Sequence, residues 1–251
     1  MVKLITGSAN DLGRNLCYQF AKKKCQIICI DKDEPKNNNT VRVIKQFHPE
    51  CNIKSFICDV SQYEQVQKVF QEILAEFKHV DILINNVAIN ICKEFIEDYT
   101  ETQIKDILNT NVLSHFWTTK EILLSMEKRD IGYIVGISSI AGIAAIKHIN
   151  PYCASKFAVT GFMQSLENQL RANKSNIRAL SVRPYFMVTQ MVNPKMLNHR
   201  KTQRLSLSCF FRIERVLDPP AVAQKIVESI ENGETRLIMP FYIWGKKCVW
   251  K

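Results

Sequence analysis

The sequence predicts an α/β protein with a doubly wound parallel sheet of about seven strands and helices on both faces. Two observations lead to this fold class. Short apolar runs rich in Ile, Val and Leu alternate with longer amphipathic segments along the chain, as in parallel sheets that are covered on both faces. The polar residues that stand out also follow the apolar runs directly, and sheets of this kind bind ligands at the carboxyl ends of their strands.

The apolar runs predict seven strands. They span residues 2–6, 26–31, 53–58, 81–85, 133–138, 177–182 and 237–239. Each run is short and rich in β-branched residues, which favours a strand over a helix. The polar or glycine residues at or just after their ends are Gly7, Asp31, Asp59, Asn85, Ser139 and Pro184. We therefore expect these six residues to cluster at one edge of the sheet.

The amphipathic segments between the strands predict the helices. These helices span residues 11–24, 40–48, 61–77, 100–127, 151–172 and 218–233. Ser61 and Thr100 each stand three residues before a Glu or Gln, which is the spacing of a capping box at a helix start. Asp218, followed by two prolines, predicts the start of the last helix, and Gly233 predicts its end.

Length and composition limit the class of protein. The 251 residues fit a single domain over residues 1–251, and no linker or repeat suggests a second one. No apolar run reaches the roughly 18 residues that span a bilayer. The first strand begins almost at Met1, so we expect neither a secretory signal nor an N-terminal anchor. The nine cysteines are scattered without a CxxC pair, which favours reduced, buried thiols over a disulfide framework or a metal site.

The net charge of +10 is the unusual feature of the composition. Part of it lies in residues 195–215, where six Lys and Arg accompany one acid, Glu214. With the aromatic and basic tail at residues 241–247, this segment is either a solvated surface or a basic lip that faces an anionic membrane. We expect no nucleic-acid binding, because no aromatic–basic single-strand motif or recognition helix accompanies the charge.

A glycine-containing turn joins the first strand to the first helix. In the run Thr6-Gly7-Ser8-Ala9-Asn10-Asp11-Leu12-Gly13, glycine lets backbone N–H groups approach a pyrophosphate, and the helix N-terminus favours the anion. Asp31 ends the second strand, where a carboxylate accepts hydrogen bonds from the adenosine ribose and repels a 2′-phosphate. These residues predict a Rossmann-type dinucleotide site that takes NAD in preference to NADP, although the neighbouring Lys32 favours NADP.

Tyr152 and Lys156 stand four residues apart near the start of a predicted helix, so their side chains share one face. A nearby ammonium and the helix dipole are expected to lower the pKa of the phenol, which would let Tyr152 exchange a proton with an alcohol. Ser139 follows a strand and is placed to hydrogen-bond the substrate oxygen. Asn111 lies inside a predicted helix, at a position where the pattern expects an apolar residue. These four residues form the expected catalytic set.

The two groups of residues together resemble the short-chain dehydrogenase/reductase family over nearly the whole chain. The resemblance implies that Asn111, Ser139, Tyr152 and Lys156 are catalytic. It also implies a set of cofactor contacts, which are Gly7, Ser8, Asn10, Asp11, Leu12, Gly13, Asp31, Asp59, Val60, Asn86, Val87, Ala88, Tyr152, Lys156, Pro184 and Thr189. Within that set, Asp59 would contact the adenine, and the Thr189 hydroxyl would meet the nicotinamide carboxamide.

The segments Asn111–Trp117 and Pro151–Phe157 are most similar to the branch of epidermal retinol dehydrogenases and type 11 and type 13 17-beta-hydroxysteroid dehydrogenases. This similarity implies a lipophilic alcohol, ketone or aldehyde as substrate, such as a retinoid or a steroid. It also implies a homodimer that pairs through the helices at 101–127 and 151–172, and a location on the cytoplasmic side of the endoplasmic reticulum or of lipid droplets.

The chain departs from the family pattern at three places. Asp11 replaces a glycine of the turn, Val87-Ala88 replaces Ala-Gly, and the N-terminal hydrophobic anchor of the branch is missing. The main hypothesis is an NAD-dependent alcohol dehydrogenase. The alternative is a catalytically weak nucleotide-binding protein that acts through a partner or a membrane surface. Residues 187–217 are expected to cover the substrate but have no readable pocket pattern.

Overall fold

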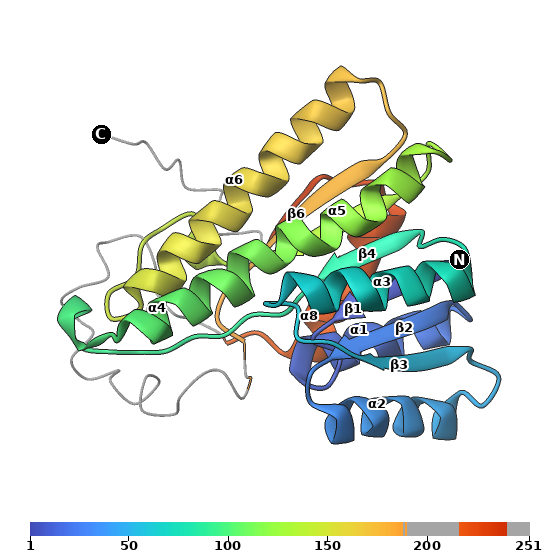
Figure 1. Cartoon of the computed structure of the whole chain (residues 1–251), viewed down its shortest axis with the longest axis horizontal. Helices are drawn as coiled ribbons and strands as arrows, with labels where there is room; N and C mark the ends of the chain where they lie inside the picture. Colours follow the sequence, from blue (N-terminus) through green and yellow to red (C-terminus); the bar gives the residue numbers. More distant parts are fainter. Residues whose placement is uncertain (188, 190–215, 240–251) are drawn as a thin grey trace.

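The computed structural model describes residues 1–187, 189 and 216–239, which build one seven-stranded sheet (Figure 1). The strands are β1 (Val2–Thr6), β2 (Gln26–Asp31), β3 (Ile53–Ile57), β4 (Ile82–Asn85), β5 (Tyr133–Ile137), β6 (Arg178–Pro184) and β7 (Arg236–Met239). Their order is β3-β2-β1-β4-β5-β6-β7, and every pair is parallel. The predicted fold class is therefore confirmed.

The strand order reverses direction next to β1, which pairs with both β2 and β4. In the register, Leu4 lies opposite Ile28 on one side and Leu83 on the other. All five residues of β1 are buried, as expected for a central strand with a helix layer on each face. A reversal of this kind opens a crevice at the carboxyl ends of the strands, which is where ligands bind in such sheets.

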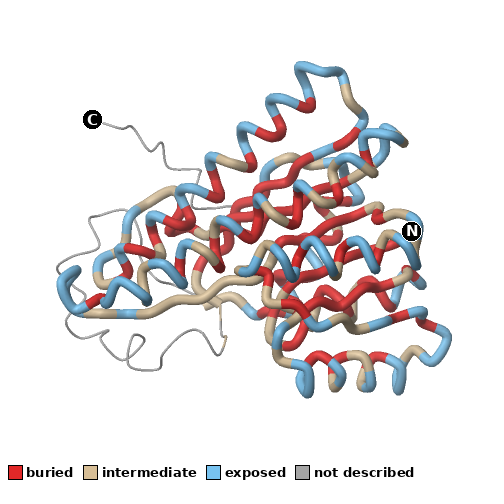
Figure 2. Tube along the Cα trace, viewed as in Figure 1, coloured by how far each residue is buried: buried red, intermediate tan, exposed pale blue. Residues whose placement is uncertain are grey.

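Two apolar layers hold the helices against the sheet. Helices α1 (Asp11–Lys22) and α8 (Pro219–Glu231) pack on one face, with Leu16 and Ile226 in the same buried cluster as Ile5. Helices α3 (Tyr63–Phe77), α5 (Ser114–Glu127) and α6 (Asn150–Ala172) cover the other face, where Phe70 and Met163 join the cluster around Leu4. Figure 2 shows the buried residues concentrated in the strands and on the inner sides of these helices.

Helix α2 (Glu34–Phe47) is longer than the predicted 40–48. The Asp33 carboxylate accepts a hydrogen bond from the Lys36 backbone N–H at 3.1 Å, and Pro35 lies in the first turn. Both are helix-start features. Asn37, in the added first part of the helix, is fully buried and donates to the Cys29 carbonyl of β2 at 3.1 Å.

The two predicted capping boxes have different outcomes. Thr100 accepts from the Gln103 N–H and Gln103 accepts from the Thr100 N–H, both at 3.2 Å, so the box that opens α4 (Glu101–Leu108) is confirmed. The box at Ser61 is wrong. Its hydroxyl donates instead to Asp59 Oδ1 at 2.7 Å, and α3 begins after Gln62 without a side-chain cap. The helix starts one residue later than predicted, so Gln62 and not Ser61 is its N-cap.

The predicted long helix at 100–127 is interrupted. A π-helical turn, Asn109–Leu113, separates α4 from α5, and such turns are frequent at functional sites.

The last helix begins after Asp218, whose side chain makes no capping hydrogen bond, and it ends before Gly233, which has a φ of +69°. The strand and helix ends otherwise agree with the predictions to within a few residues.

Several sequence predictions fall outside the described residues. These are the basic segment at 195–215, the tail at 241–247 and most of the expected substrate cover at 187–217. The ends of that cover are described: Met187 and Leu217 form a β-bridge. In the part of the chain that the structure describes, no helix is long and apolar enough to cross a membrane. No metal-binding group of His, Cys, Asp or Glu occurs among the same residues, whose seven cysteines are free thiols.

Candidate active site

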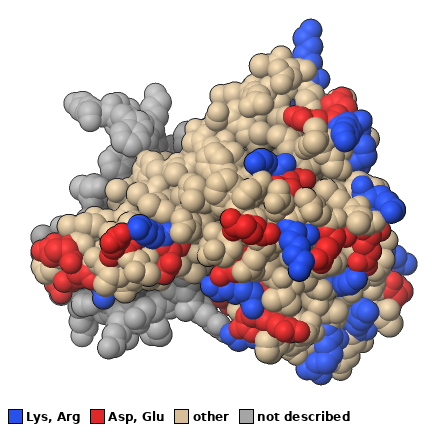
Figure 3. Space-filling model, in the orientation of Figure 1, with Lys and Arg blue, Asp and Glu red and all other residues tan. Residues whose placement is uncertain are grey.

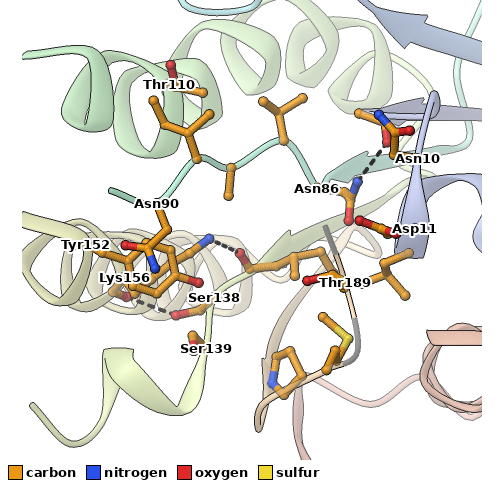
Figure 4. A pocket seen from close by; sticks show the side chains of 18 of the residues that line it. Asn10, Asp11, Asn86, Asn90, Thr110, Ser138, Ser139, Tyr152, Lys156 and Thr189 are labelled. Carbon is orange, nitrogen blue, oxygen red and sulfur yellow. Dashed lines mark hydrogen bonds between the residues drawn. The ribbon is translucent and has the colours of Figure 1, made fainter. Parts of the chain in front are cut away.

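A cavity of about 550 Å³ opens at the carboxyl ends of the strands (Figure 4). Most of the predicted cofactor contacts line it, namely Gly7, Asn10, Asp11, Leu12, Asp31, Asp59, Val60, Asn86, Val87, Ala88, Tyr152, Lys156, Pro184 and Thr189. Ser139 lines it as well. Ser8, Gly13 and Asn111 do not form part of the wall. The fold therefore brings residues from six strand ends into one space, although Asn86 and not the expected Asn85 represents β4 in the wall.

The glycine turn lies closely against the loop that follows β4. Gly7 has a φ of +69°, and a Cβ on it would lie 2.8 Å from Asn86 Nδ2. A Cβ on Gly13 would lie only 2.0 Å from the Gly7 carbonyl oxygen. The Asn86 amide donates to the Thr6 carbonyl at 2.9 Å and thereby ties the two loops together. Both glycines are required by this packing, which keeps the backbone at the cavity wall free of side-chain bulk.

The turn is held in place from the side away from the cavity. The Ser8 hydroxyl donates to Asn37 Oδ1 at 2.7 Å, and the Ser8 carbonyl accepts from the Thr40 hydroxyl at 3.0 Å. Arg14 donates to the Ala9 carbonyl at 2.6 Å. The Ser8 side chain therefore points into the helix layer, whereas the sequence pattern had placed it among the cofactor contacts. Asn37 and Thr40 were missed, because no motif marks them.

Asp31 lies on the cavity wall at the end of β2. Its Oδ2 accepts from the Ala9 N–H at 3.1 Å and its Oδ1 from the Asp33 N–H at 3.0 Å. Lys32, beside it, forms an ion pair with Asp59 Oδ2 at 3.3 Å. The exposed ammonium of Lys32 therefore has a carboxylate partner beside Asp31.

Asp11 occupies the first residue of α1 and lines the cavity. Its φ is +39°, in the left-handed region that favours glycine. The backbone at Asp11 thus has a conformation that suits glycine, while the side chain adds a negative charge to the wall.

Three of the predicted catalytic residues converge in the cavity (Figure 4). The Ser139 hydroxyl hydrogen-bonds the Tyr152 phenol. Lys156 Nζ lies 5.5 Å from the centre of the Tyr152 ring and donates to the Ile137 carbonyl at 2.9 Å. The Lys156 side chain is almost completely buried. A hydroxyl, a phenol and an amine therefore face the same small volume.

Burial dominates the ionisation of this group. It raises the pKa of the Tyr152 phenol to about 12, although the hydrogen bond with Ser139 lowers it. It also lowers the pKa of Lys156 to about 7. The expectation of a lowered Tyr152 pKa is therefore wrong. Desolvation of the phenolate is the larger effect, and the amine is bonded to a carbonyl instead of the phenol.

Asn111 lies in the π-helical turn, fully buried behind the cavity wall. Its Oδ1 accepts from the Ile89 N–H at 2.7 Å, and its Nδ2 donates to the Ile89 carbonyl at 2.9 Å. The same amide donates to Ser155 Oγ at 3.0 Å. Asn111 thus fixes the loop after β4 relative to the helix that carries Tyr152.

Several wall residues were not predicted. They are Lys32, Asp33, Cys58, Ile89, Asn90, Thr110, Ile137, Ser138, Ile140, Ala141, Ile146, Ile149, Tyr185, Phe186 and Met187. Most are apolar and carry no chemical signature in the sequence. Asn90 follows a strand by a few residues, as the predicted polar residues do, and that position was the one available signal.

Comparison with known proteins identifies the family. The family model described as short chain dehydrogenase matches residues 1–200 of this chain. The chain belongs to the short-chain dehydrogenase/reductase family. This is a family of oxidoreductases, and the resemblance inferred from the residues is thereby confirmed.

Curated relatives place the chain in the expected branch. It is 38% identical to short-chain dehydrogenase/reductase family 16C member 6 of Bos taurus, over 95% of this chain and 72% of that protein. It is 32% identical to human epidermal retinol dehydrogenase 2, over 95% and 74% of the two chains. With 17-beta-hydroxysteroid dehydrogenase 13 of Rattus norvegicus it is 28% identical, over 96% and 75%.

Solved structures share the fold at low identity. A short-chain dehydrogenase/reductase from Burkholderia phymatum in complex with NAD has a TM-score of 0.84 and 21% identity, over 97% of this chain and 90% of that one. A short-chain dehydrogenase from Sphingobium yanoikuyae in complex with NADPH has a TM-score of 0.82 and 17% identity, over 98% and 90%.

Proposed function

We propose that the chain is an NAD-dependent dehydrogenase that interconverts a lipophilic alcohol and its ketone or aldehyde. The observation that carries the proposal is the convergence of Ser139, Tyr152 and Lys156 in one cavity with the glycine turn at Gly7. The wall has a cradle for a dinucleotide at one end and a proton-exchanging group at the other.

The cofactor end fits NAD on two observations. Neither Gly7 in the wall nor Gly13 in the same turn has room for a Cβ, and this bare turn suits the close approach of a pyrophosphate to the backbone and to the start of α1. The Asp31 carboxylate at the wall suits the ribose hydroxyls and disfavours a 2′-phosphate. The pairing of Lys32 with Asp59 supports the same preference, because the ammonium already has an anionic partner.

The chain's own residues would orient the substrate and move its proton. When bound, NAD supplies the group that accepts or returns the hydride. Ser139 and Tyr152 would both hydrogen-bond the substrate oxygen, and Tyr152 Oη would exchange a proton with it. With its pKa near 12, the phenol is protonated at neutral pH and ready to act as an acid in carbonyl reduction. Lys156, with a pKa of about 7, gains and loses a proton close to neutral pH.

The substrate end supports a lipophilic compound. Its wall is formed largely by apolar side chains, including Ile140, Ile146, Ile149 and Met187. The relatives named as retinol and 17-beta-hydroxysteroid dehydrogenases support a retinoid or steroid alcohol as the first compounds to test.

The proposal is tested by following absorbance at 340 nm with NAD and a panel of retinoid and steroid alcohols. We expect turnover by the parent protein. Tyr152→Phe should lower kcat by roughly 10²- to 10⁴-fold while its NAD affinity, measured by calorimetry, stays close to that of the parent. A parent that binds NAD but oxidises none of the alcohols would instead support the catalytically weak nucleotide-binding protein. Activity of Tyr152→Phe at the parent level would remove Tyr152 from the mechanism.

We also propose that the chain forms a homodimer through α5 and α6. Association with an anionic surface of the endoplasmic reticulum or lipid droplets, on the cytoplasmic side, stays an expectation from the sequence, because its basic residues lie outside the described part.

A further inference from the structure

Asn90 stands out as a polar side chain on the apolar side of the cavity. It lines the wall together with Ile89, Ile146 and Ile149. Its Oδ1 atom is buried and has no hydrogen-bond partner among the residues that the structure describes. Buried amide oxygens in native proteins are nearly always hydrogen-bonded, so an exception at a ligand cavity needs an explanation.

The backbone on both sides of Asn90 is fixed. The Asn111 side chain binds both the N–H and the carbonyl of Ile89, at 2.7 and 2.9 Å. On the other side, the Tyr99 hydroxyl donates to the Ile91 carbonyl at 2.8 Å and to the His148 carbonyl at 3.1 Å. Hydrogen bonds therefore fix the backbone on both sides of Asn90, so its side chain does not belong to a loose loop.

The same contacts tie the loop of Asn90 to the helix that carries the reacting group. Asn111 also donates to Ser155 Oγ at 3.0 Å, and Ser155 donates to the Tyr152 carbonyl at 2.7 Å. A continuous run of hydrogen bonds thus joins the loop of Asn90 to the helical turn of Tyr152. In Figure 4 the Asn90 side chain extends from its loop toward Tyr152, with Ser139 on the other side of the phenol.

We propose that Asn90 is a specificity residue, and that its carboxamide binds a second oxygen of the substrate on the carbon next to the one that is oxidised or reduced. This inference rests on the proposed dehydrogenase function and narrows its substrate class. A carboxamide offers one acceptor and two donor hydrogens, so it pairs with either a hydroxyl or a keto oxygen. A substrate with a single oxygen, such as retinol, leaves the amide unpaired.

The selectivity follows from the cost of an unpaired polar group. A site built to hydrogen-bond an oxygen discriminates against the analogue that lacks it, because its own buried group then stays without a partner. One hydrogen bond of ordinary strength corresponds to roughly a tenfold difference in kcat/KM. The apolar remainder of the wall still requires a lipophilic body, so the expected substrates are vicinal diols and hydroxyketones with a hydrocarbon tail.

The test compares three probes of equal chain length, 2-dodecanol, 2,3-dodecanediol and 3-hydroxy-2-dodecanone, by kcat/KM with NAD. We expect the parent to favour both two-oxygen probes by roughly tenfold over 2-dodecanol. In Asn90→Leu, which keeps the size but loses the polar atoms, this ratio should fall to about one. Asn90→Asp should keep the preference for the diol, because a carboxylate accepts from a hydroxyl, and lose it for the hydroxyketone. As a control, Asn52→Leu changes an exposed asparagine that is distant from Asn90 in the sequence, and it should keep the parent ratios.

A parent with no preference among the probes would overturn the inference, and so would a preference that survives in Asn90→Leu. An equal loss on all three probes in Asn90→Leu also contradicts it, since the residue would then serve the common machinery. If the parent oxidises none of the probes, the retinoid and steroid panel alone decides the dehydrogenase proposal. Calorimetric binding of the diol and of 2-dodecanol to the NAD-bound parent and to Asn90→Leu then decides the role of Asn90 separately.

Discussion

Asp11 shows how one residue can oppose the site that it helps to form. The residue keeps a positive φ of +39°, and its carboxylate lies on the wall that would face the cofactor pyrophosphate. Like charges about 4 Å apart repel by ~1 kcal/mol in water and ~4 kcal/mol at an effective dielectric of 20. A glycine would remove the charge and would adopt the same backbone without a steric cost.

We therefore expect Asp11→Gly to bind NAD at least about fivefold more tightly, since ~1.4 kcal/mol corresponds to a factor of ten. The gain should shrink as ionic strength rises, because salt screens the repulsion. Calorimetric titration of both proteins at two salt concentrations measures it. Equal affinities would mean that the turn accommodates the carboxylate without loss.

His115 is a second residue whose ionisation could not be predicted from its position in the sequence. It lies on α5, fully buried near Lys156. Burial, and then the charge of Lys156, lower its pKa from 6.5 to about 3. The folded protein thus holds a neutral imidazole over a pH range in which the unfolded chain binds a proton.

The sign of the effect on stability follows from that difference. Because the folded pKa lies below the unfolded one, the free energy of unfolding falls as the pH drops from about 6.5 toward 3. The loss reaches ~1.4 kcal/mol per pH unit. Between pH 7.5 and 5.5 the parent should lose about 1.4 kcal/mol more than His115→Leu, as measured by urea unfolding. Lys156 titrates in both proteins and so cancels from the comparison. Parallel pH profiles would show that His115 is not buried as a neutral ring.

At the scale of elements, Asn37 joins α2 to the sheet and to the glycine turn. It accepts from the Ser8 hydroxyl at 2.7 Å, and its amide donates to the carbonyls of Cys29 at 3.1 Å and Phe56 at 3.2 Å. Asn37→Ala should lower the free energy of unfolding by about 1–3 kcal/mol, because buried groups lose their partners. NAD affinity should weaken as well, since Ser8 is no longer held. Gln46→Ala, at an exposed position of the same helix, should change stability by under about 0.5 kcal/mol. A similar loss in both variants would contradict a specific role of Asn37.

The elements also show what the sequence can and cannot predict. Strand positions and the residues at their ends follow from apolar runs, so the cavity wall around Gly7, Asp31 and Ser139 was predictable. The π-helical turn at Asn109–Leu113 was not, because helical periodicity does not distinguish it from α-helix. The ionisation of Tyr152 and Lys156 depends on burial, which tertiary packing decides, and so the sequence led to the wrong direction for Tyr152. Asn90 lacked a motif, and its importance comes from the unpaired oxygen that only the fold reveals.

The whole molecule has an apolar outer face where α5 and α6 lie side by side. Phe116 of α5 and Phe162 of α6 pack with ring centres 4.4 Å apart, yet Phe116 remains 43% exposed. Leu124 and Phe157 on the same two helices are 60% and 43% exposed. A Cβ added to Gly161 would meet nothing within 4 Å. Few charged side chains interrupt this region in Figure 3. Exposed Lys120 lies between Phe116 and Leu124 on α5, so the apolar surface is formed mainly by Phe116 and Phe157. Exposed apolar patches mark protein interfaces, and a glycine permits close approach of a partner helix.

These features support the proposed homodimer and define its test. Sedimentation equilibrium at micromolar concentration should give twice the chain mass of 29.0 kDa. Phe157→Glu should give the monomer, because pairing about a two-fold axis would bring the same face of both chains together and bury two uncompensated charges. Phe47→Glu places the same charge on α2 at a phenylalanine that is 63% exposed, and it should leave the dimer intact. Since the proposed catalytic residues Tyr152 and Lys156 belong to α6, the Phe157→Glu monomer should also lose part of its turnover, as that helix loses its outer support. A parent that sediments as a monomer, or a Phe157→Glu variant that stays dimeric, would show that this face serves another purpose.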